Sequence, residues 1–136
     1  MNNNKTIAAV QRDVRRSAFG KILATLEEGC DGFIAAIFYD ELGETIDYHS
    51  YLDPFDTRLA GAHHGLFMSS INGRSKWIGI GQVNYIEILA SERESLTVLV
   101  GEELFLTVLV KIGALNATLH KRVNDIIDIL CDEIGV

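Results

Sequence analysis

The sequence of 136 residues contains one proline, two cysteines and no long hydrophobic run. Cys30 and Cys131 are too few for a disulfide framework, and a chain of this length does not need one, so we expect reduced thiols. The longest apolar or small-residue run, residues 32–39, is much shorter than the roughly 20 residues that cross a bilayer. The first residues lack the apolar core of a signal peptide. We therefore expect a cytosolic protein without a transmembrane segment.

Positive charge is also scarce, because 12 basic residues face 19 acidic ones and give a net charge of −7. Such a chain repels a phosphate backbone, so nucleic-acid binding is not expected. Arg12, Arg15 and Arg16 are a local exception. They are typical of a solvated helix face, and the alternative is a contact patch for an acidic partner.

Motifs that carry chemistry are missing as well. The sequence has no G-x-S-x-G, H-E-x-x-H or C-x-x-C and no phosphate-binding G-x-x-x-x-G-K-[ST]. His63 and His64 are adjacent on a predicted helix and point about 100° apart, which does not suit two ligands of one metal. Asp125, Asp128 and Asp132 are interpreted as a solvated helix face or a partner surface. We predict no catalytic, metal or cofactor site, and no enzymatic activity.

Hydrophobic periodicity predicts a helix, two strands, a helix, three strands and a helix. The uncharged run at residues 32–39 indicates a strand that is covered on both faces. Because the strands come in hairpins, the sheet should be antiparallel with helices packed on it. This is an α+β fold, an α/β sandwich, in a single domain over residues 1–136 with a flexible segment at 1–10. The predicted helices are 11–28, 54–71 and 115–134, and the predicted strands are 32–39, 44–52, 77–90, 95–100 and 104–112.

The predicted second helix is unusual because small residues line one of its faces. Gly61, Gly65 and Ser69 fall at i, i+4 and i+8, beside Ala60 and Ala62. Each glycine costs about 1 kcal/mol of helix propensity relative to alanine, so a close contact should offset that cost. Two interpretations remain open: close packing on the helix's own sheet, or a helix-to-helix contact in a dimer.

The element order and several local patterns resemble the roadblock/dynein-light-chain (roadblock/LC7) domain family over residues 17–131. The matching patterns are L-E-E-G at 26–29, D-E-L-G at 40–43, the small-residue second helix, and V-L-V-K-I-G-A-L-N at 108–116. The resemblance implies the order α-β-β-α-β-β-β-α and a five-stranded antiparallel sheet with helices on both faces. Within the family, the sequence is similar to the small-GTPase regulators of the bacterial gliding-motility type.

The resemblance also implies a homodimer, or a heterodimer with a paralogous roadblock protein. In that family the second helix packs against the partner's copy, and the third strand pairs across the two-fold axis. The implied interface residues are Gly61, Ala62, Gly65, Ser69, Val83, Tyr85, Ile86 and Ile88.

The function implied by the resemblance is a non-enzymatic regulator or scaffold that binds a small Ras-like GTPase and modulates its nucleotide state. Arg58, Arg74 and Arg93 are the arginines to test for a role in GTP hydrolysis. A structural dimerisation subunit without a GTPase partner, as in dynein, is the alternative. A weaker third hypothesis is a small-molecule sensor with a cavity against the sheet.

Overall fold

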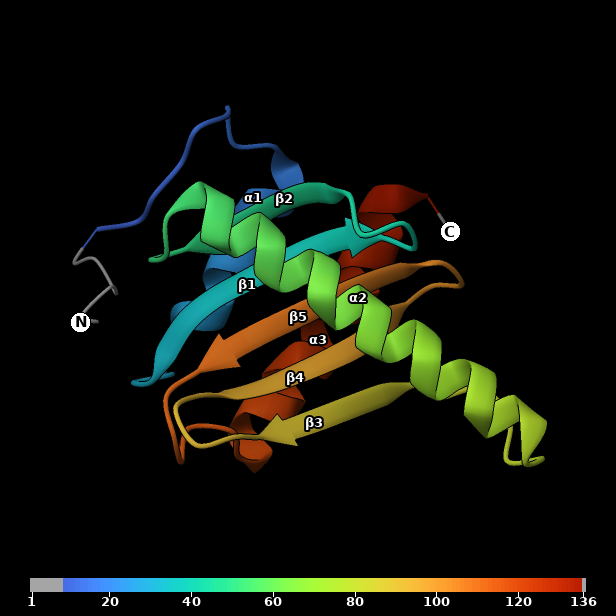
Figure 1. Cartoon of the computed structure of the whole chain (residues 1–136). Helices are drawn as coiled ribbons and strands as arrows, with labels where there is room; N and C mark the ends of the chain where they lie inside the picture. Colours follow the sequence, from blue (N-terminus) through green and yellow to red (C-terminus); the bar gives the residue numbers. More distant parts are fainter. Residues whose placement is uncertain (1–8, 136) are drawn as a thin grey trace.

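The computed structural model describes residues 9–135 (Figure 1). The predicted flexible segment at 1–10 falls mostly on residues 1–8, which lie outside the described residues. The described part contains three α-helices, one short 3-10 helix and five strands. In chain order they are α1 (Ala18–Ala24), η1 (Thr25–Glu27), β1 (Phe33–Asp40), β2 (Thr45–Ser50), α2 (Pro54–Trp77), β3 (Tyr85–Leu89), β4 (Glu94–Val100), β5 (Leu104–Val110) and α3 (Ala117–Ile134).

The five strands form one sheet in the order β2-β1-β5-β4-β3, and every neighbouring pair is antiparallel. Helices α1 and α3 cover one face of this sheet, and α2 runs obliquely across the other (Figure 1). The element order, the antiparallel pairing and the helices on both faces confirm the predicted fold class. In the register, Phe38 lies opposite Leu106 and Thr97 lies opposite Thr107.

Strand β1 lies inside the sheet and inside the sandwich, which explains its lack of charge. Every residue from Phe33 to Tyr39 is buried. Ala36 and Phe38 pack into the cluster beneath α1 and α3, whereas Ile37 and Tyr39 belong to the cluster beneath α2. Alternate side chains of a strand point to opposite faces, so both faces must be apolar here.

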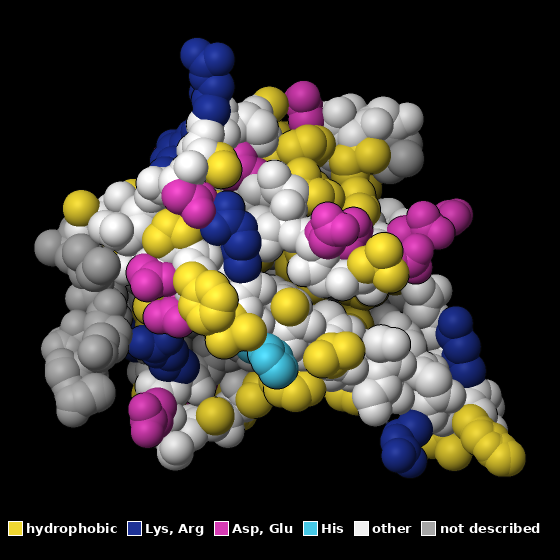
Figure 2. Space-filling view, turned by 45° about the horizontal axis from the view of Figure 1, so that its top comes forward, with side chains coloured by type: hydrophobic (Ala, Val, Ile, Leu, Met, Phe, Trp, Pro, Cys, Tyr) yellow, Lys and Arg dark blue, Asp and Glu magenta, His cyan; other side chains and the backbone are white. Residues whose placement is uncertain are grey.

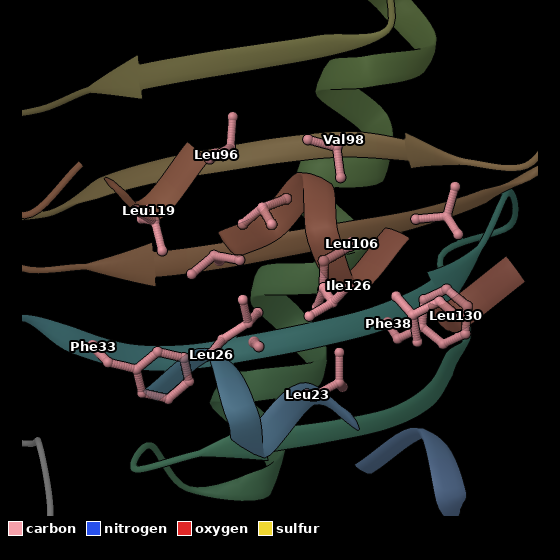
Figure 3. Close-up of a cluster of buried hydrophobic side chains, with 14 of the residues drawn as sticks. Leu23, Leu26, Phe33, Phe38, Leu96, Val98, Leu106, Leu119, Ile126 and Leu130 are labelled. Carbon is pink, nitrogen blue, oxygen red and sulfur yellow. The ribbon is translucent and has the colours of Figure 1, made fainter. Parts of the chain in front are cut away.

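The larger of the two clusters fills the space between the sheet and the α1–α3 layer (Figure 3). Helix α3 contributes one buried stripe, as its periodicity predicts: Leu119, Val123, Ile126 and Leu130. The Asn116 side chain caps this helix by accepting a hydrogen bond from the Leu119 N–H at 2.9 Å.

The first helix is shorter than predicted, because residues 11–17 are not helical. This segment crosses the outer edge of β2, where the Gln11 N–H donates to the Ser50 carbonyl at 2.8 Å. The predicted basic helix face therefore does not exist. Arg12 instead forms an ion pair with Asp47 at 2.7 Å, a tertiary contact that helical periodicity does not reveal.

The second helix is longer than predicted, and the strand that follows is shorter. Helix α2 continues past Asn72 and Gly73 to Trp77, and β3 begins only at Tyr85. Asn72 lies inside the helix and not at its end. Its side-chain oxygen accepts a hydrogen bond from the Val83 N–H at 2.7 Å. The helix ends before Gly79, whose φ of +83° is easily adopted by glycine alone.

Candidate protein-interaction site

The glycines of α2 pack on the sheet of their own chain. A Cβ atom added at Gly61 would lie 3.0 Å from Cγ2 of Ile37, and one added at Gly65 would lie 3.3 Å from Cε2 of Tyr39. A methyl group at either position would press on β1, so glycine lets the helix approach this strand closely. Close packing on the helix's own sheet is what the structure shows for them, and their role in a dimer stays a prediction.

The outer face of α2 carries a largely exposed apolar stripe, which the β1–β2 turn approaches at Ala62. At 100° per residue, positions 55, 59, 62, 66, 69, 73 and 77 fall on one side of a helix. Phe55, Leu66 and Trp77 are 69%, 64% and 73% exposed, and Leu59 is also exposed. We call these seven positions the outer stripe. Ala62 and Ser69, two of the predicted interface residues, lie on it. The large apolar residues beside them were not among the predicted interface residues.

The outer stripe was visible in the sequence as a near-heptad spacing of apolar and small residues. Figure 2 shows hydrophobic side chains distributed along this face, with acidic side chains among them. An exposed apolar row of this kind on one helix is typical of a surface that binds another protein.

The two edge strands of the sheet differ in whether another segment of the chain covers them. The edge of β2 is covered by residues 11–17, through the Gln11 backbone and the Arg12 side chain. Strand β3, at the other end of the sheet, pairs only with β4 among the described residues. An open strand edge of this kind can pair with another chain.

The predicted strand residues lie at this open edge. Ile86 and Ile88 are half-buried and face the α2 side, because they lie opposite Thr97 and Ser95. Tyr85 points to the α3 side, where its ring lies 5.6 Å from that of His120. Val83 precedes the strand and is held by Asn72. The structure thus brings the β3 edge and the C-terminal half of α2 to the same side of the molecule (Figure 1).

A polar network anchors the segment that covers β2. Asp47 is buried and accepts hydrogen bonds from the Arg12 side chain at 2.7 Å, from the Ser17 hydroxyl at 2.6 Å and from the Gly20 N–H at 3.1 Å. Burial by itself would raise the pKa of the Asp47 carboxyl, but the hydrogen bonds from Ser17 and Arg12 outweigh burial and lower it.

Arg58, one of the three arginines proposed for a test of a role in GTP hydrolysis, forms an ion pair within its own chain. Its guanidinium donates to both oxygens of Asp13 at 2.6 and 2.8 Å and lies 5.4 Å from the centre of the Tyr48 ring. Hydrogen bonds from Arg58 and Tyr48 hold the pKa of Asp13 well below its usual range. Arg74 is exposed near the end of α2, and Arg93 is half-buried in the β3–β4 turn.

The histidines do not form a metal site in the described part of the chain, where no cluster of three metal-ligating side chains occurs. His63 is exposed, whereas His64 bonds to the Ala60 carbonyl through Nδ1 at 2.8 Å and to the Ser95 hydroxyl through Nε2 at 2.9 Å. A carbonyl only accepts, so Nδ1 carries the proton and Ser95 donates to Nε2. Burial lowers the pKa of His64.

The remaining candidates are exposed or half-buried residues of α3 and of the segment after η1. Asp125, Asp128 and Asp132 are exposed on α3, as predicted for a solvated helix face. Cys30 and Cys131 are free thiols, and burial raises the pKa of Cys30. No helix within residues 9–135 is both long and apolar enough to span a membrane.

Several surface hollows are large enough to receive side chains of a partner, and three of them are near the elements discussed above. One of about 460 Å³ lies between the β1–β2 turn and the start of α2, and one of about 570 Å³ lies between α2 and the β3–β4 turn. A third, of about 380 Å³, lies before α3. All three are open to solvent.

Comparison with solved structures identifies the fold, although no protein-family model and no curated protein matches the sequence. A roadblock/LC7 domain from Streptomyces avermitilis superposes with a TM-score of 0.81 at 16% identity, covering 88% of this chain and 100% of that one. Myxococcus xanthus MglB gives a TM-score of 0.75 at 17% identity, covering 87% of this chain and 98% of that one. The gliding protein MglB from Thermus thermophilus gives 0.70 at 13% identity, covering 88% of this chain and 93% of that one.

These similarities extend over nearly all the described elements and agree with the element order that the sequence predicts. The TM-scores show a shared fold, and at identities of 13–17% the similarity extends to the fold alone. The chain has the fold of the roadblock/LC7 domains.

Proposed function

We propose that the protein works as a dimer, formed with a second copy of itself or with a paralogous roadblock protein. The observation that carries this proposal is the difference between the two sheet edges: β2 is covered by its own chain, whereas β3 is open among the described residues. Pairing of β3 with the partner's β3 would extend the sheet and remove an edge that otherwise promotes aggregation.

The outer stripe of α2 supports the same arrangement from Leu66 onward. Leu66 and Trp77 would pack against the partner's helix, together with Ser69. Fully burying a large apolar side chain is worth about 1.5–3 kcal/mol, so a few such residues make a stable contact. Gly61 and Gly65 would then act within the protomer by letting α2 approach β1. A solved MglB structure is described as having a tetrameric arrangement, so assembly occurs among proteins of this fold.

Mass in solution tests the dimer directly. Leu66→Asp places a charge in the proposed contact, and it should convert a dimer of the 15.0 kDa chain into a monomer in size-exclusion chromatography with light scattering. Ile129→Asp, on the exposed face of α3, is the matched control and should leave the mass unchanged. A Leu66→Asp protein with the wild-type mass would rule out the proposed helix contact.

We further propose that the dimer is a cytoplasmic, non-enzymatic regulator or scaffold for a small Ras-like GTPase. The fold shared with MglB proteins and the exposed apolar surfaces support this role. Such a protein shifts the state of a GTPase only if it prefers one nucleotide form over the other. Because Arg58 is committed to Asp13, the proposed mechanism repositions residues of the GTPase and does not insert this arginine.

Affinity capture in two nucleotide states tests the GTPase proposal. The tagged protein is incubated with cytosol of its source in the presence of a GTP analogue or of GDP, and captured proteins are identified by mass spectrometry. A small GTPase enriched in one state is expected. Equal capture in both states would leave a scaffold, and a nucleotide-independent assembly without a GTPase would favour the structural-subunit alternative.

A further inference from the structure

A second surface feature lies at the other end of α2, far from β3. It is the hollow of about 460 Å³ between the β1–β2 turn and the first turns of α2. We call it the hairpin groove; its lining includes Gly43, Glu44, Phe55, Arg58, Leu59 and Ala62. The turn and the helix are in direct contact, since a Cβ at Gly43 would lie 3.2 Å from Cα of Ala62. This contact sets the position of the turn relative to the helix, and so the shape of the groove.

The groove is bordered by apolar side chains that are left in solvent. Phe55 and Leu59 come from α2 and line the groove, and Leu42, next to the lining residue Gly43 in the turn, is 82% exposed. The turn that carries Leu42 is held in shape, because Asp40 Oδ1 accepts hydrogen bonds at 2.9 Å from the N–H groups of Leu42 and Glu44. A site that is already shaped loses little conformational entropy when it binds a partner.

The rim of the groove is negatively charged. Glu44 lines the groove, and three more exposed carboxylates lie close to its lining residues in the sequence: Glu41 in the β1–β2 turn, and Asp53 and Asp56 on either side of Phe55 at the start of α2. The cation lining the groove, Arg58, has its charge balanced by the bidentate contact with Asp13. An apolar centre with an acidic rim is complementary to an apolar ligand that carries positive charges on its flanks.

The position of the groove makes it independent of dimerisation. It lies at the β1–β2 side of the sheet, and four strand spacings of about 4.8 Å, or roughly 19 Å, separate β2 from β3. A dimer formed through β3 and the C-terminal half of α2 would leave one groove open on each protomer. The backbone edge of β2 is bonded by the covering segment at Tyr48 and Ser50, which shortens the stretch of this edge that an added strand could use.

From these observations we propose that the hairpin groove binds an amphipathic helix of a partner protein, with apolar residues on one face and lysines or arginines beside them. The apolar face would contact Leu42, Phe55 and Leu59, and the basic residues would pair with the carboxylates of the rim. A helix is the fitting shape because the apolar lining, Phe55, Leu59 and Ala62, is a helix face, against which another helix can pack.

The probe is a fluorescein-labelled peptide of about 18 residues, or roughly five helical turns, made only of leucine and lysine and ordered so that the leucines form one helical face. Its affinity for the full-length protein is measured by fluorescence anisotropy. A peptide of the same composition in scrambled order is the control ligand. We expect the amphipathic peptide to bind about tenfold more tightly, a ratio that corresponds to roughly 1.4 kcal/mol.

Two pairs of variants locate the site. Leu42→Ser combined with Phe55→Ser should weaken binding about tenfold, whereas Ile129→Ser on α3 should not change it. Glu41→Lys with Glu44→Lys should weaken it several-fold more than Glu102→Lys with Glu103→Lys, which makes the same change in net charge in the β4–β5 turn. Circular dichroism and mass in solution establish that every variant is folded and keeps the wild-type oligomeric state.

Two kinds of result would overturn the proposal, one from the peptides and one from the variants. Equal binding of the amphipathic and scrambled peptides would show that only overall charge attracts them. Equal losses from the two lysine pairs, or no loss from the Leu42 and Phe55 changes, would place any binding outside the groove. Both results are separate from the dimer proposal, because mass in solution is measured without peptide.

Discussion

Asp47 shows how a single residue secures the start of this fold. Its side chain is 1% exposed, and it joins the covering segment, the start of α1 and strand β2 through hydrogen bonds from Arg12, Ser17 and Gly20. A buried carboxylate is stable only when it is bonded in this way. Because those bonds favour the charged form, they lower the pKa of Asp47 despite its burial.

This lowered pKa makes stability depend on pH in a defined direction. The contribution of Asp47 is complete above its ordinary pKa of 3.8 and is lost as the pH falls toward the lowered value. We expect Asp47→Asn to reduce the free energy of unfolding by about 1–3 kcal/mol at neutral pH. Urea unfolding at neutral pH and at a pH below 3.8 should show that the difference between wild type and variant shrinks in acid. A difference that stays constant or grows would contradict this account.

The glycines of α2 provide a second prediction at the residue scale. A methyl group at Gly61 would meet Ile37 at 3.0 Å, whereas one at Gly73 would meet nothing within 4 Å. Gly73→Ala should therefore raise the free energy of unfolding by about 0.5–1 kcal/mol, measured in the Leu66→Asp background because position 73 lies on the outer stripe. Gly61→Ala should give no gain or a loss, because Ile37 must move. Thermal unfolding of the two variants compares them directly, and equal gains would mean that α2 does not pack closely on β1.

At the scale of elements, the segment 11–17 acts as a cover for the edge of β2. It has little regular structure of its own and is held by Gln11 through the backbone and by Arg12 and Asp13 through side chains. An uncovered strand edge exchanges its amide protons readily and can pair with other chains. The cover explains why β3, and not β2, is the edge available for association.

Arg12→Ala should loosen this cover. We expect faster hydrogen exchange across β2 (Thr45–Ser50), measured by mass spectrometry, because the ion pair with Asp47 and the bond to the Tyr48 carbonyl are lost. Arg15→Ala, a change of another exposed arginine in the same segment, is the control and should leave exchange in β2 unchanged. Equal protection in the Arg12→Ala protein would mean that the backbone bond of Gln11 is sufficient to hold the segment.

At the scale of the whole molecule, the two faces of α2 have separate roles. The inner face, with Gly61 and Met68, packs on the sheet and completes the protomer. The outer face is divided: Phe55 and Leu59 border the hairpin groove, whereas Leu66 and Trp77 lie toward β3. One long helix can therefore carry a dimer contact and a partner-binding groove without overlap.

If the protein dimerises as proposed, its thermal stability should depend on concentration. Association that occurs only in the folded state raises the midpoint of unfolding as protein concentration increases. We expect a higher midpoint for the wild type when its concentration is raised about 100-fold, and no such shift for Leu66→Asp. Scanning calorimetry or nano-fluorimetry at two concentrations makes this measurement. A midpoint independent of concentration in the wild type would argue against a dimer.

The sequence by itself determined the order of elements, because hydrophobic periodicity and turn residues are local. The uncharged run at 32–39 identified β1, the stripe from Leu119 to Leu130 identified α3, and Asp53 with Pro54 marked the start of α2. The dimer residues and the GTPase partner came from family resemblance, and they stay predictions.

The tertiary structure alone decided the ends of α1 and α2 and the direction in which the glycines face. Residues 11–17 look helical by periodicity but bind Asp47, which lies far away in the chain. Asn72 looks like a helix stop, yet its side chain bonds to Val83. A stripe of small residues shows that some surface approaches α2 closely, but whether that surface belongs to the same chain depends on how the helix is placed on the sheet. Such long-range contacts leave no periodic signal in the sequence.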